Sequence, residues 1–209
     1  GEGSGVLPSK EWKQGRFGKP WYPGETVISG IGQGFWVVTP VQLASAVATI
    51  SVGGVAHRPR LLHATQQGIG DAPEPVAESQ AQPAIFRDPA NWNAIREGMI
   101  AVVNGPTGTA RTMGIGFPYV IAGKSGTAER YSRTTEAWEH LSPVAIGRHQ
   151  VLFEAFTPAE APRISVIVAL EAGRGGGRDA APVARKMLDA WLIGEGQVPS
   201  TAQSGVDPP

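Results

Sequence analysis

Residues 123–128 of this chain, Gly-Lys-Ser-Gly-Thr-Ala, carry the side chains best suited to chemistry. One chemistry that uses Gly-Lys-Ser is phosphate binding by a loop that wraps around the anion. Such a loop needs another glycine five residues before Gly123, where this chain has Pro118, and a helix directly afterwards. Gly126 and Thr127 do not favour a helix. Nucleotide binding is therefore the weakest hypothesis, and the absence of any ATP-induced shift in melting temperature would dispose of it.

The alternative to a phosphate-binding loop is that the same residues form an exposed strand at the edge of a sheet. Along a strand, Ser125 and Thr127 place two hydroxyls on one face, while Lys124 projects from the other. Gly126 leaves the backbone open, so that an extended peptide can pair with the edge. The Lys124 ammonium adds positive potential for a terminal carboxylate. Because such a triplet arises by chance in about one chain in ten of this size, the neighbouring elements must support it.

The elements around the motif predict an antiparallel sheet. The apolar run Tyr119–Ala122 favours a strand over residues 117–124, and further strands are expected at 151–156 and 163–171. The last two are separated by a short turn, so they should be antiparallel neighbours. The final strand alternates, with Ile164, Val166, Val168 and Leu170 on one face, and Ile167 and Ala169 on the other suggest that both faces are covered.

Three helices are expected. Thr39 and Pro40 predict the start of one that ends at Gly53-Gly54, and Asp88 with Pro89 predicts a second that ends at Asn104. A third should begin at Asp179 and end at Gly194. Their expected buried faces are Val41, Ala44, Val47, Ala48 and Ser51; then Trp92, Ile95, Met99 and Val103; then Val183, Met187 and Trp191.

The order of these elements indicates an α+β fold, not an alternating βαβ fold. We expect residues 1–38 to form an extended loop without helix or strand, because they are rich in glycine, proline and aromatic residues. Residues 64–84 are expected to form a surface loop, and residues 196–209 a disordered tail. Residues 1–195 would then belong to one domain.

The composition excludes several classes of function. The 18 basic and 18 acidic residues balance, so no global field attracts nucleic acid or an anionic membrane. The chain has no cysteine, which excludes disulfides and thiolate metal sites. No stretch reaches the roughly 20 apolar residues of a spanning helix, and the first ten residues lack the apolar core of a signal peptide. The chain as given is expected to be soluble.

Several segments together resemble the penicillin-binding protein 2 family, class B transpeptidases of the elongation type. The resemblance covers nearly the whole chain apart from residues 65–83 and the tail. The aromatic spacing in residues 12–26 is its most specific part. The segments that carry it are Glu11-Trp12-Lys13, Arg16-Phe17, Pro20-Trp21-Tyr22, Gly24-Glu25-Thr26, Gly30–Gly34, Thr39–Gln42, Lys124–Ala128 and Val166–Glu171.

This resemblance implies the C-terminal part of a transpeptidase domain with a penicillin-binding and serine β-lactamase-like fold. The activity would be D,D-transpeptidation of peptidoglycan through a serine acyl-enzyme, without metal or organic cofactor. Lys124 would bind the peptide carboxylate and support the polar network around the catalytic serine. Ser125 and Thr127 would hydrogen-bond that carboxylate beside Gly126. The backbone N–H of Thr127 would form half of the oxyanion hole, an interaction often worth several kcal/mol.

The resemblance also implies partners and a location. The substrates would be D-Ala-D-Ala stem peptides and the inhibitors β-lactams, and the parent protein would work with a glycan polymerase and other proteins of the rod complex. No nucleic acid is expected. The parent protein would be held in the bacterial inner membrane and face the periplasm.

Two motifs of the family are missing from this chain. No serine has lysine three residues later, as in the nucleophile motif Ser-x-x-Lys, and none has asparagine two residues later, as in Ser-x-Asn. We expect both upstream of Gly1, with two further strands of the sheet, so that the fragment alone is inactive and has an exposed sheet edge. The alternative function is a non-catalytic β-lactam sensor or scaffold, in which the complete protein would be acylated but would not crosslink peptides.

Other candidate sites are weaker. Gly173–Arg178 precedes a helix and could bind an anion, with Arg174 and Arg178 as minor contacts, but a flexible connection is the favoured interpretation. Gly32-Gln33-Gly34 lacks the third glycine of a dinucleotide site, and a tight turn is expected there. The four histidines show no metal-ligand spacing.

Overall fold

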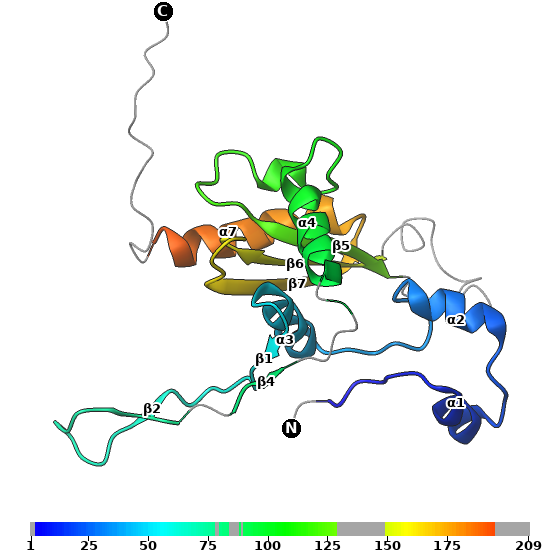
Figure 1. Cartoon of the computed structure of the whole chain (residues 1–209), viewed down its shortest axis with the longest axis horizontal. Coiled ribbons are helices and arrows are strands. Elements are labelled where there is room, and N and C mark those ends of the chain that lie inside the picture. The colour runs from blue at the N-terminus through cyan, green and yellow to red at the C-terminus, as the bar shows by residue number, and fades with distance from the viewer. Residues whose placement is uncertain (1–2, 78–79, 84–87, 89, 129–148, 195–209) are drawn as a thin grey trace, which may run out of the picture. The chain divides into compact units, whose positions relative to one another are not determined.

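The computed structural model of the chain describes residues 3–77, 80–83, 88, 90–128 and 149–194 (Figure 1). The predicted tail, residues 196–209, and Pro89 lie outside these ranges. The chain divides into two compact units, unit 1 (Gly1–Leu43) and unit 2 (Ala44–Pro209). Helices combine with antiparallel sheets, which confirms the predicted α+β class. Among the described helices, none is both long enough and apolar enough to cross a membrane.

Unit 1 contains two helices, so the prediction of an extended loop over residues 1–38 was wrong. α1 (Lys10–Phe17) begins because the Ser9 hydroxyl accepts the Trp12 N–H at 3.0 Å, and it ends at Gly18, whose φ of 64° closes the helix. α2 (Pro23–Gly30) begins with proline in its first turn, and the Glu25 carboxylate accepts the Tyr22 N–H at 2.8 Å. These local caps outweigh the glycine-rich composition.

Contacts between aromatic rings and one partly buried ion pair hold unit 1 together. Trp12 and Phe17 of α1 meet Phe35 in edge-to-face and tilted arrangements, with ring centroids 5.4–5.6 Å apart. The Lys13 ammonium pairs with Glu25 and lies 4.1 Å from the centroid of the Tyr22 ring. Lys13 of α1 therefore contacts both α2, through Glu25, and the residue that caps it, Tyr22.

The third helix begins where the sequence predicts. α3 (Pro40–Ser51) begins at a reciprocal cap, in which the Thr39 hydroxyl accepts the Gln42 N–H at 3.2 Å and the Gln42 amide oxygen accepts the Thr39 N–H at 3.0 Å. Val47 is buried as predicted, whereas Val41 is 47% exposed. The turn expected at Gly32–Gly34 is present, since the N–H groups of Gly32 and Gln33 donate to carbonyls at the end of α2.

Residues 55–83 form two short ladders. β1 (Val55–Ala56) pairs with β4 (Gln82–Pro83), and β2 (Ala64–Thr65) pairs with β3 (Glu74–Pro75), both antiparallel. β3 and β4 are exposed, as expected of a surface segment. Each strand of these ladders is two residues long.

α4 (Ala90–Asn104) follows the predicted cap, since the Asp88 carboxylate accepts the Ala90 N–H at 2.8 Å. Met99 and Val103 are buried as predicted, but Ile95 is 44% exposed. Arg96 is turned toward the protein instead, where its guanidinium donates to the Ala159 carbonyl. The inward face of α4 therefore combines the apolar Met99 and Val103 with one polar contact made by Arg96.

The main sheet has three antiparallel strands in the order β5-β6-β7, namely β5 (Ala122–Ala128), β6 (His149–Thr157) and β7 (Ile164–Gly173). The expected hairpin of the last two strands is confirmed. β5 begins at Ala122 and not at Phe117, because the Val120 carbonyl accepts from the Thr157 hydroxyl at 3.1 Å and from the Ala159 N–H at 2.8 Å. Within the described ranges, the outer edges of β5 and β7 pair with no other strand.

Helices cover both faces of this sheet (Figure 1). One face presents Val151, Phe153, Ala155, Val166 and Val168 to α7 (Ala181–Leu192), and Phe153 and Leu188 of this cluster are fully buried. The other face packs Ala122 and Phe156 against Val47 of α3 and Met99 of α4. Coverage of β7 is one-sided, contrary to the prediction, because Ile167 is only half-buried and Ala169 is exposed.

The last helix starts later than predicted and is rotated. A π-helical turn, Gly176–Ala180, precedes α7, so the helix begins at Ala181 and not at Asp179. Val183 and Met187 are 41% and 48% exposed, against the prediction that they form the buried face. The buried positions are Ala181, Ala184, Leu188 and Leu192, where the two small alanines allow the helix to approach the sheet closely.

Candidate substrate-binding strand

The predicted motif lies on β5, at the edge of the three-stranded sheet. Lys124 and Thr127 are exposed, whereas Ser125 and Gly126 are half-buried. The strand is anchored at its start by Ala122 and Gly123, which are buried. The sequence motif thus runs from the core of unit 2 to its surface, and its functional groups lie at the surface end.

Lys124 lies opposite a carboxylate. Its ammonium donates to the Ser125 carbonyl at 2.5 Å, and its cross-strand partner is Glu154 of β6. Burial raises the pKa of the Glu154 carboxyl above its usual value, and the positive charge of Lys124 opposes that shift. This stretch of the sheet therefore combines a surface cation with a carboxylate that burial disfavours in its charged form.

Ser125 meets a second hydroxyl. Its Oγ lies 2.9 Å from the Thr109 Oγ1, and either atom can be the donor. Thr109 belongs to the loop between α4 and the 3₁₀ turn Arg111–Met113. Sequence inspection missed this residue, because a contact between residues 16 positions apart depends on how the loop folds back on the strand.

Gly126 is packed more tightly than an open strand edge requires. A Cβ built at this position would lie 3.2 Å from the Leu152 Cβ, which is closer than ordinary side-chain packing. A Cβ at Gly176 would overlap the Leu152 carbonyl and the Gly126 backbone, and one at Gly177 would overlap the Thr109 carbonyl. The glycines of the π-helical turn therefore let its backbone wedge between β5 and the Thr109 loop.

The connection Gly173–Arg178 is hydrogen-bonded to the carboxylate of the next residue, Asp179. Asp179 accepts N–H groups from Arg174 at 2.6 Å and from Gly175 at 3.3 Å. The hydrogen bond from the Arg174 N–H, more than any other contact, holds the pKa of Asp179 below its usual value. Asp179 occupies the N–H groups that an anion would need, and Arg178 lies 3.7 Å from it.

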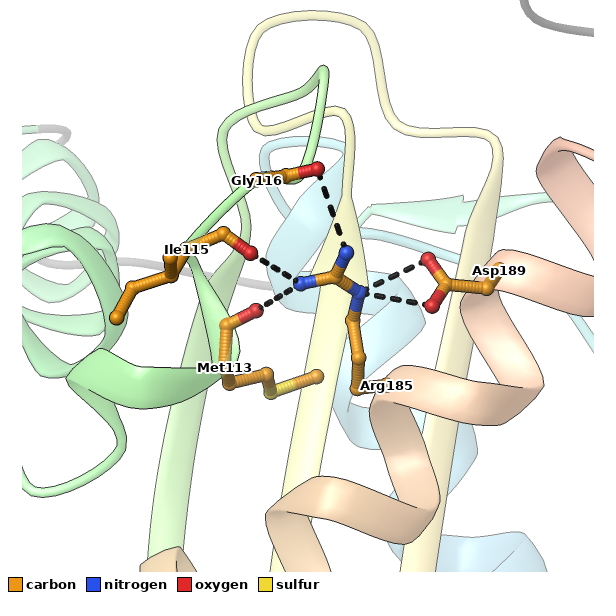
Figure 2. A network of polar contacts seen from close by, with 5 residues as sticks. All are labelled: Met113, Ile115, Gly116, Arg185 and Asp189. Atoms are coloured by element: carbon orange, nitrogen blue, oxygen red, sulfur yellow. Dashed lines mark hydrogen bonds and ion pairs between the residues drawn. The ribbon is translucent and has the colours of Figure 1, made fainter.

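A second polar network fixes the loop before β5 (Figure 2). The Arg185 guanidinium donates to the carbonyls of Met113 at 2.5 Å, Ile115 at 3.0 Å and Gly116 at 3.5 Å. Its Nε donates to both Asp189 oxygens, at 2.8 and 3.0 Å. The four-residue spacing of Arg185 and Asp189 on a helix is visible in the sequence, but the carbonyl partners are not.

In the described ranges, no three histidine or acidic side chains lie together as the ligands of a metal ion would. The described site is built instead from hydroxyls, an ammonium and an exposed strand edge. These groups can bind an extended peptide and its terminal carboxylate.

An antiparallel sheet flanked by helices, with Lys-Ser-Gly-Thr on its edge strand, is the arrangement expected of a serine transpeptidase or β-lactamase type of domain. The chain matches the model of the penicillin binding protein transpeptidase domain over residues 1–189, and it belongs to that family.

Individual relatives show which members of the family the chain resembles. The chain is 37% identical to the peptidoglycan D,D-transpeptidase MrdA of Haemophilus influenzae over 188 residues, covering 89% of the chain and 28% of the relative. It matches the crystal structure of PBP2 of Pseudomonas aeruginosa in complex with WCK 5153 with 40% identity and a TM-score of 0.77, covering 99% of the chain and 42% of that structure.

A second similar structure, from work on a peptidoglycan synthase complex that coordinates polymerization and crosslinking, has 31% identity and a TM-score of 0.71 over 96% of the chain and 30% of its own length. The chain thus spans less than a third of the H. influenzae relative that it matches.

Proposed function

We propose that this chain is the substrate-binding part of an elongation-type peptidoglycan D,D-transpeptidase that β-lactams acylate. The observation that carries the proposal is the Lys124–Thr127 strand, exposed at a sheet edge in a member of the transpeptidase family. The names of its relatives, MrdA and PBP2, support the reaction and the elongation type.

The proposed roles follow from the position of each group. The Lys124 ammonium and the hydroxyls of Ser125 and Thr127 bind the carboxylate of a D-Ala-D-Ala stem peptide or of a β-lactam. The backbone at Gly126 lies beside the bound peptide, and the Thr127 N–H stabilises the oxyanion of the tetrahedral intermediate. No step of this acyl transfer calls for a metal or an organic cofactor.

The nucleophile is proposed to come from outside these 209 residues. The chain contains no Ser-x-x-Lys and no Ser-x-Asn, and its relatives are longer than it is. The 209-residue chain alone is therefore expected not to react with penicillin, whereas the product of the complete gene is expected to react.

Acylation of the complete gene product by a fluorescent penicillin tests this function. Lys124→Ala should slow acylation about 10- to 100-fold, because a charge-assisted contact with the carboxylate is lost. Lys186→Ala is the matched control, since Lys186 is exposed on α7, and it should react at the wild-type rate. Equal rates for Lys124→Ala and wild type would contradict the proposed role.

A second assay separates the enzyme from a sensor. The wild-type gene product should also join D-Ala-D-Ala peptides to an acceptor amine. Acylation by penicillin without any such transfer would instead favour a β-lactam sensor or scaffold. Failure of acylation in the wild type would overturn both functions.

The proposal extends to location and partners. The substrate chemistry favours the periplasmic face of the bacterial inner membrane. The similarity to a structure from a peptidoglycan synthase complex supports a glycan polymerase and other rod-complex proteins as partners. Co-purification of the complete gene product with a glycan polymerase, after mild membrane extraction, would test this assignment.

A further inference from the structure

Thr109 offers a hydroxyl to the proposed binding strand from a separate part of the chain. Its Oγ1 lies 2.9 Å from the Oγ of Ser125, which is a normal length for a hydroxyl–hydroxyl hydrogen bond. Thr109 is exposed and Ser125 is half-buried, so the pair lies where the strand reaches the surface. No motif of the sequence pointed to Thr109.

The backbone around Thr109 is held on both sides. The next residue, Ala110, is 1% exposed, and its N–H donates to the Val102 carbonyl of α4 at 3.0 Å. On the other side, the Gly177 backbone packs so close to the Thr109 carbonyl that a Cβ there would overlap it. Thr109 is therefore placed by α4 and by the π-helical turn, not by its contact with Ser125.

A hydroxyl held in this way can control the proton of its neighbour. Ser125 has one O–H, and it must donate that proton to a carboxylate in order to bind it. The Thr109 hydroxyl can then donate to the Ser125 oxygen, which gives the chain Thr109 to Ser125 to carboxylate. Consecutive hydrogen bonds of this kind polarise and strengthen one another.

We propose that Thr109 is a positioning residue that directs the Ser125 hydroxyl toward the carboxylate of the substrate or of a β-lactam. The inference rests on the proposed function, because it assigns Ser125 to carboxylate binding. Thr109 acts through Ser125 and makes no contact of its own with the reacting atoms.

A double-mutant cycle on the rate of penicillin acylation of the complete gene product tests this role. Thr109→Val keeps the shape and removes the hydroxyl, and it should slow acylation about 3- to 10-fold. Thr109→Ser restores a hydroxyl and should recover most of the rate. In a Ser125→Ala background, Thr109→Val should have almost no further effect, because the group through which Thr109 acts is already missing.

Thr112→Val is the matched control, since Thr112 is also exposed and lies three residues further along, in the 3₁₀ turn Arg111–Met113. Its rate and melting temperature should equal those of wild type. A melting temperature of Thr109→Val equal to that of Thr112→Val would show that the loss of rate is not a loss of folding.

The outcomes separate the inference from the function beneath it. Equal rates for Thr109→Val and wild type would overturn the role of Thr109 alone. Effects of Thr109→Val and Ser125→Ala that multiply independently would also overturn it, because Thr109 would then act without Ser125. Failure of the wild type to react would overturn the proposed function and this inference together.

Discussion

The two units of the chain bury different kinds of side chain. Among the described residues of unit 1, the one buried side chain is that of Lys13, which pairs with Glu25. Unit 2 instead buries a continuous apolar cluster between the sheet and α7, with Phe153 and Leu188 fully enclosed. Unit 1 therefore depends on an ion pair and on contacts between aromatic rings, and unit 2 depends on the removal of apolar surface from water.

This difference has consequences for function. The proposed binding strand belongs to unit 2, where the start of β5 is buried in a dense core and its surface end carries the polar groups. A rigid base of this kind keeps functional groups in place better than a loop does. Unit 1, by contrast, keeps Leu7, Val27 and Ile31 about 70% exposed while its helices are joined by an ion pair.

The largest expected effect concerns the apolar core of unit 2. Phe153→Ala should reduce the free energy of unfolding by about 3–5 kcal/mol, because it leaves a cavity in the core behind β5. Denaturant unfolding of the complete gene product, followed by hydrogen exchange in β5–β7, measures it. Val183→Ala, at an exposed position on α7, should change stability by less than about 0.5 kcal/mol. Similar losses for the two variants would contradict the assigned core.

A smaller effect tests the polar network in unit 2. Arg185→Lys keeps the charge but loses the planar set of donors that reaches three carbonyls and Asp189, so it should cost about 1–2 kcal/mol. Faster hydrogen exchange of residues 113–117 is the expected local sign. Lys186→Arg, one position along on the exposed side, should leave that exchange unchanged. Unaltered exchange in Arg185→Lys would mean that other contacts hold the loop.

The smallest effect concerns the ion pair between Lys13 and Glu25 in unit 1. The hydrogen bond from Lys13, together with the Tyr22 N–H, lowers the pKa of Glu25 in the folded state. A lowered pKa contributes stability that is present above the unfolded pKa of about 4.3 and is lost as pH falls through the folded value. Amides of α1 and α2 should therefore exchange faster as the solution is acidified below about pH 4.3, after correction for intrinsic rates.

Glu25→Gln removes the titrating group from this test. Its α1 and α2 amides should exchange faster already at neutral pH and should respond less to acid. Glu160→Gln, an exposed residue of unit 2, should leave the pH dependence of α1 and α2 as it is in wild type. A wild-type pH response in Glu25→Gln would show that another group controls unit 1.

Helix caps explain both the success and the failure of the sequence-based predictions. Thr39 and Asp88 stand directly before apolar periodic segments, so their helices were predicted close to the observed bounds. Ser9 and Tyr22 also precede helices, but the glycine and proline residues around them obscured the signal. In a short helix the cap supplies a large share of the stability, so composition alone misleads.

The strands, too, could be predicted from the sequence only in part. β6 and β7 were recognised because each is an apolar run bounded by turn residues. The start of β5 was misplaced, because the Val120 carbonyl accepts hydrogen bonds from Thr157 at the end of β6 and from Ala159 in the turn that follows. Hydrogen bonds between residues some 40 positions apart leave no pattern in the local sequence.

By itself the sequence determined the fold class, the hairpin β6–β7, two capped helices and the motif Lys124–Thr127, because each depends on neighbouring residues and on local periodicity. Tertiary structure alone decided which face of α7 is buried, how Gly176 and Gly177 approach β5, and which hydroxyl meets Ser125. Those features depend on contacts between segments distant in the chain, where close packing and hydrogen-bond geometry select one arrangement among many that the local sequence allows.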